Sequence, residues 1–141
     1  MDNRPDKKIL ICTVGLPRSG KTTWARSQGY PIVSPDAIRL AIHGQRFLNR
    51  AEPLVWAIAK YMVRALFLAG HDRVILDATS NTRKRRDEWC SHEWTTYFKV
   101  FDTPAKVCRA RSEAMGDLNI VPQIERMTAE HEPLEIDEML W

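Results

Sequence analysis

The segment VGLPRSGKTT, residues 14–23, combines residue types that together can hold a phosphate group. Four residues separate Gly15 from Gly20, and Lys21 and Thr22 follow directly. This is the G-x-x-x-x-G-K-[ST] spacing of a phosphate-binding P-loop, in which backbone N–H groups surround the anion and the next helix points its positive end at it. The lysine would contact the terminal phosphates, and the Thr22 hydroxyl would bind Mg²⁺. We expect the phosphates to be bound by Gly15, Leu16, Pro17, Arg18, Ser19, Gly20, Lys21, Thr22 and Thr23.

A second pair of candidate groups, Asp36 and Arg39, lies three residues apart at an expected helix start. This spacing allows both side chains to occupy one face of the helix. The carboxylate could accept the proton of an attacking hydroxyl, and the arginine could hold an anionic group of the phosphate acceptor. The spacing is equally compatible with a structural role, in which Asp36 stabilises the helix N-terminus and Arg39 is a solvated surface charge.

A third candidate, Asp77, ends the apolar run RVILD, as the Walker B acid does in P-loop enzymes. At that position it could hold a magnesium-bound water or orient Arg39. The alternative is a loop carboxylate that caps the next turn of the chain.

Two groups of arginines follow. The run RKRR, residues 83–86, cannot direct four cations to one side of a helical turn, so a solvated face is expected and contact with a backbone phosphate is the alternative. Arg109 and Arg111 lie just before a break that contains glycine. Arginines on a mobile lid can neutralise the charge of a phosphoryl group in transfer, whereas the alternative is two exposed surface charges.

Short apolar runs alternate with helical patterns, and this alternation predicts how the candidate groups are positioned. Strands are expected at 8–14, 30–34, 73–77 and 97–101, and helices at 21–29, from Pro35, at 52–69, 82–94 and 105–115, and from Pro122. The 52–69 helix carries an apolar stripe of Val55, Ile58, Met62 and Leu66.

Strands that alternate with helices indicate an α/β fold of the P-loop NTPase type. We expect a parallel sheet of about four strands sandwiched by helices, followed by a C-terminal helical lid region. Ligands bind at the carboxyl ends of the strands in such sheets. The P-loop, Asp36 and Asp77 follow the first, second and third expected strands, so all three should meet at one edge.

The composition is that of a soluble globular protein, with 44% hydrophobic and 28% charged residues in 141. This length suits a single domain, 1–141. No apolar stretch is long enough to cross a bilayer, the charged N-terminus has no signal-peptide pattern, and the three cysteines lack metal-ligand spacing. We therefore expect a cytoplasmic protein without a membrane partner. The net charge of +3 is compatible with an anionic partner.

The segments GLPRSGKTTWAR, VSPDAIR, VILDATSNTRKRR and VFDTPAKVCRAR, in this order, resemble the polynucleotide 5′-hydroxyl kinases. These are the kinase domains of bacteriophage and bacterial RNA end-healing enzymes. The resemblance extends from about residue 8 to residue 127, nearly the whole chain. It implies ATP- and Mg²⁺-dependent transfer of the γ-phosphate to a nucleic acid with a 5′-hydroxyl end, either DNA or RNA.

The resemblance also implies a role for each matching residue. Lys21 and Thr22 match the P-loop lysine and hydroxyl, and Asp36 matches the general base. Arg39 matches the arginine that holds an acceptor phosphate. The catalytic set implied in this way is Lys21, Asp36, Arg39, Asp77, the strand-end acid, and Arg111, a lid arginine.

The chain departs from the family's pattern at Met115, where members often carry a further arginine four residues after the position of Arg111. Arg109 could replace it. A D-x-D-x-T phosphatase motif is absent from the sequence, so removal of 3′-phosphates is not expected.

Other classes of P-loop protein remain as alternatives. The N-K-x-D and D-x-x-G motifs of signalling GTPases are absent. A regulatory ATPase usually carries additional elements for assembly. A kinase of a small-molecule hydroxyl, such as that of a sugar, nucleoside or antibiotic, shares the same core and is the main alternative. Because the only space for an inserted segment that could enclose such an acceptor is residues 43–50, the polynucleotide is favoured.

Overall fold

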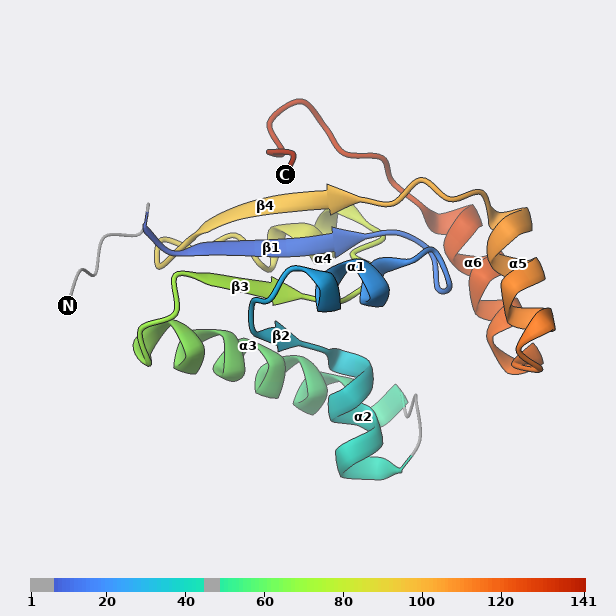
Figure 1. Cartoon of the computed structure of the whole chain (residues 1–141), viewed down its shortest axis with the longest axis horizontal. Helices are drawn as coiled ribbons and strands as arrows, with labels where there is room; N and C mark the ends of the chain where they lie inside the picture. Colours follow the sequence, from blue (N-terminus) through green and yellow to red (C-terminus); the bar gives the residue numbers. More distant parts are fainter. Residues whose placement is uncertain (1–6, 45–48) are drawn as a thin grey trace.

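The computed structural model describes residues 7–44 and 49–141. Its centre is one parallel sheet with strand order β2-β3-β1-β4 (Figure 1). The strands are β1 (Ile9–Val14), β2 (Ile32–Val33), β3 (Arg73–Leu76) and β4 (Thr95–Val100). Because β1 pairs with both β3 and β4, Ile11 lies opposite Ile75 on one side and Tyr97 on the other. The expected parallel α/β fold is confirmed.

Helices connect the strands and cover the sheet. They are α1 (Lys21–Ser27), α2 (Pro35–His43), α3 (Glu52–Leu68), α4 (Arg83–Asp87), α5 (Ala105–Ala114) and α6 (Val121–Glu130), with 3₁₀ turns η2 (Asn49–Ala51) and η3 (Leu118–Ile120). In Figure 1, α5 and α6 lie together beyond the carboxyl ends of β1 and β4. This helical pair lies where the C-terminal lid region is expected.

The core is divided by the sheet into two layers, because successive side chains of β1 point to opposite faces. Leu10, Cys12 and Val14 are fully buried in the larger layer, which includes α3. Ile11 packs on the other face with Ala25 of α1. Burial of β1 on both faces is typical of a central parallel strand. It fixes the loop that follows Val14 at the carboxyl edge of the sheet.

The face of α3 that packs against the sheet differs from the predicted stripe. Met62 is 37% exposed, and Ile58 and Leu66 lie only at the margin of the core. The sequence of α3 is apolar around most of its circumference, so two stripes of similar hydrophobicity compete. Packing against the sheet selects the side chains of Val55, Ala59, Val63 and Phe67.

Helix α4 is much shorter than the predicted helix over residues 82–94. It ends at Asp87, and the chain then turns so that Trp89 and Trp94 enter the core. Nε1 of Trp94 and Oγ1 of Thr96 both donate to the Trp89 carbonyl, at 2.9 and 2.8 Å. Burial of the two indoles outweighs the local preference of this segment for a longer helix.

The C-terminal segment, residues 131–141, returns alongside β4. Phe98 donates its N–H to the Met139 carbonyl, and its own carbonyl accepts from Trp141, each at 2.9 Å. The rings of Trp141 and Tyr97 meet edge to face. Over residues 7–44 and 49–141, none of the helices combines the length and the apolar character that a membrane crossing requires.

Candidate active site

The loop between β1 and α1 has the tight geometry that the P-loop motif requires. A Cβ atom on Gly15 would lie 2.8 Å from the Ser19 hydroxyl and 2.9 Å from the Phe101 carbonyl, so only glycine fits there. Gly20 has φ = 101°, a left-handed conformation that favours glycine. Arg18 has φ = 67°, which is strained for a residue with a side chain.

The N-terminus of α1 is open to an anion. Its N-cap is Gly20, and no side chain caps it. Among the described residues, the N–H groups of Gly20, Lys21 and Thr22 have no protein acceptor. Unpaired N–H groups that follow a tight glycine loop suit a phosphate. The loop can therefore accept the phosphates of a nucleotide.

Lys21 is 8% exposed, and its ammonium folds back onto its own loop. Nζ donates to the Leu16 carbonyl at 2.5 Å and to the Ser19 hydroxyl at 3.4 Å. Burial lowers the pKa of Lys21 to about 8, although the Asp77 and Asp36 carboxylates act in the opposite direction. The carboxylates of both predicted acids therefore lie close enough to Lys21 to influence its charge.

Asp77 and Thr22 are in direct contact. The Thr22 hydroxyl donates to Oδ2 of Asp77 at 2.7 Å. Their proximity follows from the topology, since β1 and β3 are neighbours and each residue lies beyond the carboxyl end of one of them. Helix α4, which comes next in the chain, is capped by Thr82 rather than by Asp77. The alternative role of Asp77, as a cap of the next turn, is therefore not supported by the contact with Thr22 or by the cap at Thr82.

The Thr22 hydroxyl and the Asp77 carboxylate are oxygen groups of the kind that can bind Mg²⁺. Mg²⁺ usually keeps several waters and is bound through one or two protein oxygens together with substrate phosphates. A hydroxyl and a carboxylate beside the P-loop meet this requirement. Within the described part of the chain, no group of three or more His, Cys, Asp or Glu side chains could form a metal site by itself.

Asp36 and Arg39 lie on α2, which follows the carboxyl end of β2. The N-cap of α2 is Ser34, whose hydroxyl accepts from the Ala37 N–H at 3.1 Å. Asp36 is therefore not the cap of this helix, and its side chain is 70% exposed. Oδ1 of Asp36 accepts from Nη1 of Arg39 at 2.7 Å.

Glu52, at the start of α3, is a residue of this site that sequence reasoning missed. Its carboxylate accepts from Nε and Nη2 of Arg39 at 2.9 and 2.6 Å, and both side chains are largely buried. The fork geometry of this pair holds the guanidinium in one orientation. No local signal could have revealed it, because the partners lie on different helices.

The two candidate lid arginines have different partners. Nη1 of Arg111 donates to the carbonyl of Arg18 in the P-loop at 3.0 Å. Arg109 instead pairs with Glu125 of α6 at 3.0 Å. Arg18 also reaches the lid, because its Nη2 donates to Asp117 at 2.7 Å. Only Arg111 of the two lid arginines contacts the phosphate loop.

The side chain of Met115 contacts a cationic side chain of the P-loop. Members of the resembling family often have another arginine at this position. Nη1 of Arg18 lies 3.2 Å from the Met115 sulfur. Asp117 holds the same guanidinium. The guanidinium of Arg18, from the P-loop, thus lies beside Met115, the position at which the family often has an arginine.

The expectation of a solvated face for residues 83–86 is wrong for Arg86. Its side chain is fully buried, and Glu138 of the C-terminal segment accepts from it at 2.7 Å. Arg83 pairs with Asp87, Asp137 and Glu135. These arginines therefore attach the C-terminal segment to α4. The reason is tertiary, since Glu135, Asp137 and Glu138 are about fifty residues further along the chain than the arginines they pair with.

Comparison with known families and structures agrees with this geometry. Residues 10–134 match the family AAA_33, which is described as an AAA domain. A chain of the Pnkp1/Rnl/Hen1 complex aligns with a TM-score of 0.67 and 28% identity, over 79% of this chain and 41% of that chain. A chain of the Pnkp1/Rnl/Hen1 RNA repair complex aligns with a TM-score of 0.63 and 23% identity, over 93% and 48%.

The present chain thus spans less than half of the length of these two neighbours. A sugar kinase from Janibacter sp. HTCC2649 aligns with a TM-score of 0.62 and 24% identity, over 97% of this chain and 84% of that chain. The fold is thus shared with a sugar kinase as well as with chains of the Pnkp1/Rnl/Hen1 complex. The family match over most of the chain, the parallel sheet and the glycine-bounded phosphate loop lead to one conclusion: the chain belongs to the AAA_33 family and is a P-loop domain of the kinase type.

Proposed function

We propose that the chain transfers the γ-phosphate of ATP, with Mg²⁺, to the 5′-hydroxyl of a polynucleotide. The observation that carries this proposal is the arrangement at the carboxyl edge of the sheet. There an exposed carboxylate, Asp36, lies beside Arg39, whose guanidinium is held by Glu52. The edge also carries the P-loop. A proton acceptor and an anion-binding arginine beside a phosphate loop suit an acceptor that carries both a hydroxyl and a phosphate.

The residues of the P-loop bind and orient the donor. The free N–H groups at the start of α1 donate to the phosphates, and the Lys21 ammonium exchanges its loop carbonyl for phosphate oxygens. Thr22 and Asp77, which are in direct contact, would hold Mg²⁺, and the ion would neutralise charge on the phosphates. Arg111 extends from the lid to the P-loop, where a guanidinium can stabilise the transferring group.

Asp36 and Arg39 act on the acceptor. The Asp36 carboxylate accepts the proton of the 5′-hydroxyl as that oxygen forms a bond to the γ-phosphorus. The bond from phosphorus to the β–γ bridging oxygen breaks, and the bridging oxygen keeps its electron pair and leaves with ADP. Arg39 holds the phosphate on the 3′ side of the same nucleotide.

The choice of a polynucleotide over a small molecule rests on two observations. The neighbour at 28% identity belongs to the Pnkp1/Rnl/Hen1 complex. The second is from the sequence alone: the segment 43–50 is short for a loop that would enclose a sugar, and its residues 45–48 lie outside the described residues. The similarity to a sugar kinase keeps a small-molecule hydroxyl as the second candidate.

The experiment that tests the proposal is a transfer assay with γ-labelled ATP and Mg²⁺. The acceptors are a 5′-hydroxyl DNA oligonucleotide, the RNA equivalent, a nucleoside 3′-monophosphate, and a panel of sugars and nucleosides. We expect label on the oligonucleotides that a phosphatase specific for 5′ ends removes. Efficient labelling of a sugar or nucleoside, with the oligonucleotides blank, would instead support the small-molecule kinase.

A further inference from the structure

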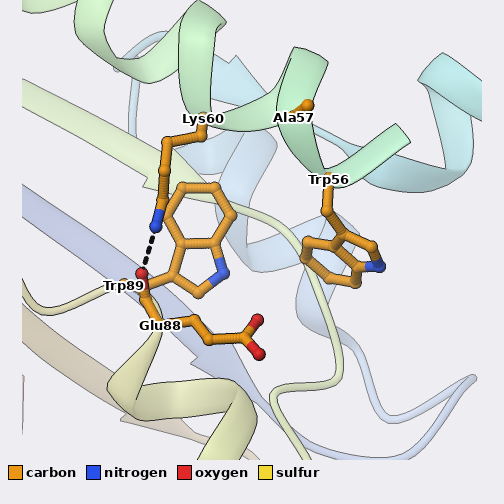
Figure 2. A pocket seen from close by; sticks show the side chains of 5 residues that line it. All are labelled: Trp56, Ala57, Lys60, Glu88 and Trp89. Carbon is orange, nitrogen blue, oxygen red and sulfur yellow. Dashed lines mark hydrogen bonds between the residues drawn. The ribbon is translucent and has the colours of Figure 1, made fainter. Parts of the chain in front are cut away.

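A pocket of about 230 Å³ lies beside Arg39, and the reaction proposed above does not use it. It opens between α3 and the turn that follows α4 (Figure 2). Its lining consists of Trp56, Ala57, Lys60, Glu88 and Trp89. The pocket therefore brings two indoles and an ammonium together.

The spacing along α3 relates this pocket to the proposed acceptor site. Glu52, Trp56 and Lys60 are each four residues apart, so they share one face of the helix. Each step of four residues advances about 6 Å along the axis. Glu52 binds Arg39. Trp56 lies one step of four residues further along the helix, and Lys60 lies two steps further. One face of α3 therefore leads from the proposed acceptor arginine into the pocket.

Trp56 is half-buried and in contact with two guanidinium groups, each of which is also paired with a carboxylate. The Arg39 guanidinium carbon lies 5.8 Å from its ring centre, and that of Arg85 lies 4.1 Å from it. The Trp89 ring lies 6.2 Å away at a tilt of 59°. Both guanidinium groups lie over the ring rather than beside it. Aromatic rings combined with nearby cations are the arrangement on which proteins stack the bases of single-stranded nucleic acid.

Lys60 supplies a charge that is available to a ligand. Its ammonium donates to the backbone carbonyl of Glu88, as Figure 2 shows. The same ammonium lies 5.2 Å from the centre of the Trp89 ring. Among the described residues it has no carboxylate partner, because the Glu88 carboxylate is paired with Arg85 at 2.8 Å. An ammonium has three N–H donors, so Lys60 can also bind a phosphate oxygen.

We propose that this pocket binds the second nucleotide of a single-stranded polynucleotide acceptor. The base of that nucleotide stacks on Trp56, and the phosphate that follows contacts Lys60. The inference rests on the proposed function, since it takes Asp36 as the site of the 5′-hydroxyl and Arg39 as the site of the first phosphate. A sugar or a single nucleotide would end at Arg39 and leave the pocket empty.

The test compares acceptors of different length in two variants. In Trp56→Leu, the KM for a 5′-hydroxyl oligonucleotide should rise by about tenfold, the size of one lost base–aromatic stack, with little change in kcat. The KM for a nucleoside 3′-monophosphate should not change. Trp56→Phe, which keeps a ring, should restore most of the oligonucleotide affinity. Lys60→Gln should also raise the oligonucleotide KM, and its salt dependence should become shallower.

A matched control is Tyr61→Leu, because Tyr61 is an aromatic residue of the same helix that is 74% exposed and outside the pocket. The binding of a fluorescently labelled oligonucleotide, followed by anisotropy without ATP, separates the two proposals. Binding that depends on Trp56 without any transfer would refute the proposed function and support the pocket. Transfer to oligonucleotides with the same KM in Trp56→Leu and wild type would overturn the pocket assignment alone. Absence of both binding and transfer would overturn both.

Discussion

Glu52 accepts hydrogen bonds from Nε and Nη2 of Arg39, so the first turn of α3 fixes the orientation of an arginine on α2. Nη1 of the same guanidinium donates to Asp36. The three side chains are therefore linked by hydrogen bonds. A change at Glu52 should lower the efficiency with which the acceptor is used and leave the affinity for ATP unchanged.

Glu52→Gln removes the charge that holds Arg39 but keeps a similar shape. We expect kcat/KM for the acceptor to fall by about 10- to 100-fold, because small displacements of a positioning group are costly. The affinity for ATP should be unchanged when measured by calorimetry. Glu93→Gln is the matched control, since Glu93 pairs with Arg64 in a half-exposed ion pair away from the site. Equal losses in both variants would contradict a positioning role for Glu52.

Asp36→Asn separates a general base from a structural carboxylate. Loss of a general base should lower kcat by about 100-fold or more while ATP still binds. Stability should barely change, because Ser34 rather than Asp36 caps α2. The measurements are single-turnover transfer and thermal unfolding. A variant with the turnover of the wild type would assign Asp36 a structural role only.

Lys21→Ala should abolish most nucleotide binding without loss of the fold. Burial lowers the pKa of this lysine, so the charged ammonium is less favourable in the folded protein than in water. Removal of the ammonium should therefore leave the melting temperature unchanged or slightly raised. Calorimetric titration with ATP and Mg²⁺ measures the effect, and Lys84→Ala, at an exposed position, is the control. Equal ATP affinity in wild type and Lys21→Ala would remove the P-loop assignment.

Arg111→Ala and Arg109→Ala test which lid arginine takes part in the reaction. Arg111 contacts the P-loop carbonyl of Arg18, whereas Arg109 faces α6. We expect kcat to fall by about 100-fold or more in Arg111→Ala, in line with the effect of other arginines that neutralise a transferring phosphoryl group. Arg109→Ala should keep near-normal turnover. The reverse result would assign the lid role to Arg109.

Arg86→Ala should destabilise the fold by about 3–5 kcal/mol, because it leaves the buried Glu138 carboxylate without its partner. Lys84→Ala, two residues away and exposed, should change stability very little. Urea unfolding compares the two. Similar stabilities would contradict a structural role for the Arg86–Glu138 pair.

The same pair predicts a pH dependence of stability. Burial acts to raise the pKa of Glu138, but the hydrogen bonds from Arg86 and from the Glu135 N–H outweigh it, so the pKa lies below its ordinary value. A carboxyl with a lowered pKa in the folded state contributes stability above its ordinary pKa and loses it as pH falls through the folded value. Glu138→Gln should therefore show a weaker loss of stability on acidification than the wild type.

Local features of the sequence were sufficient to predict the phosphate loop and the parallel sheet. The spacing of Gly15, Gly20 and Lys21 is a contiguous pattern, and the backbone conformation that it requires is set within the loop itself. Short apolar runs between helical segments predicted the strands for a similar reason. Since the carboxyl ends of parallel strands meet at one edge, the proximity of Thr22 and Asp77 also followed from the order of elements along the chain.

Tertiary packing decided the features that depend on residues far apart in the sequence. The apolar stripe of α3 was misassigned because its sequence offers more than one hydrophobic face, and only contact with the sheet selects the one that contains Val63. The pairs Arg39–Glu52 and Arg86–Glu138 join residues on separate elements. Whether an arginine is solvated or buried with a carboxylate depends on which segment the folded chain brings against it, and the spacing of charges along one helix does not contain that information.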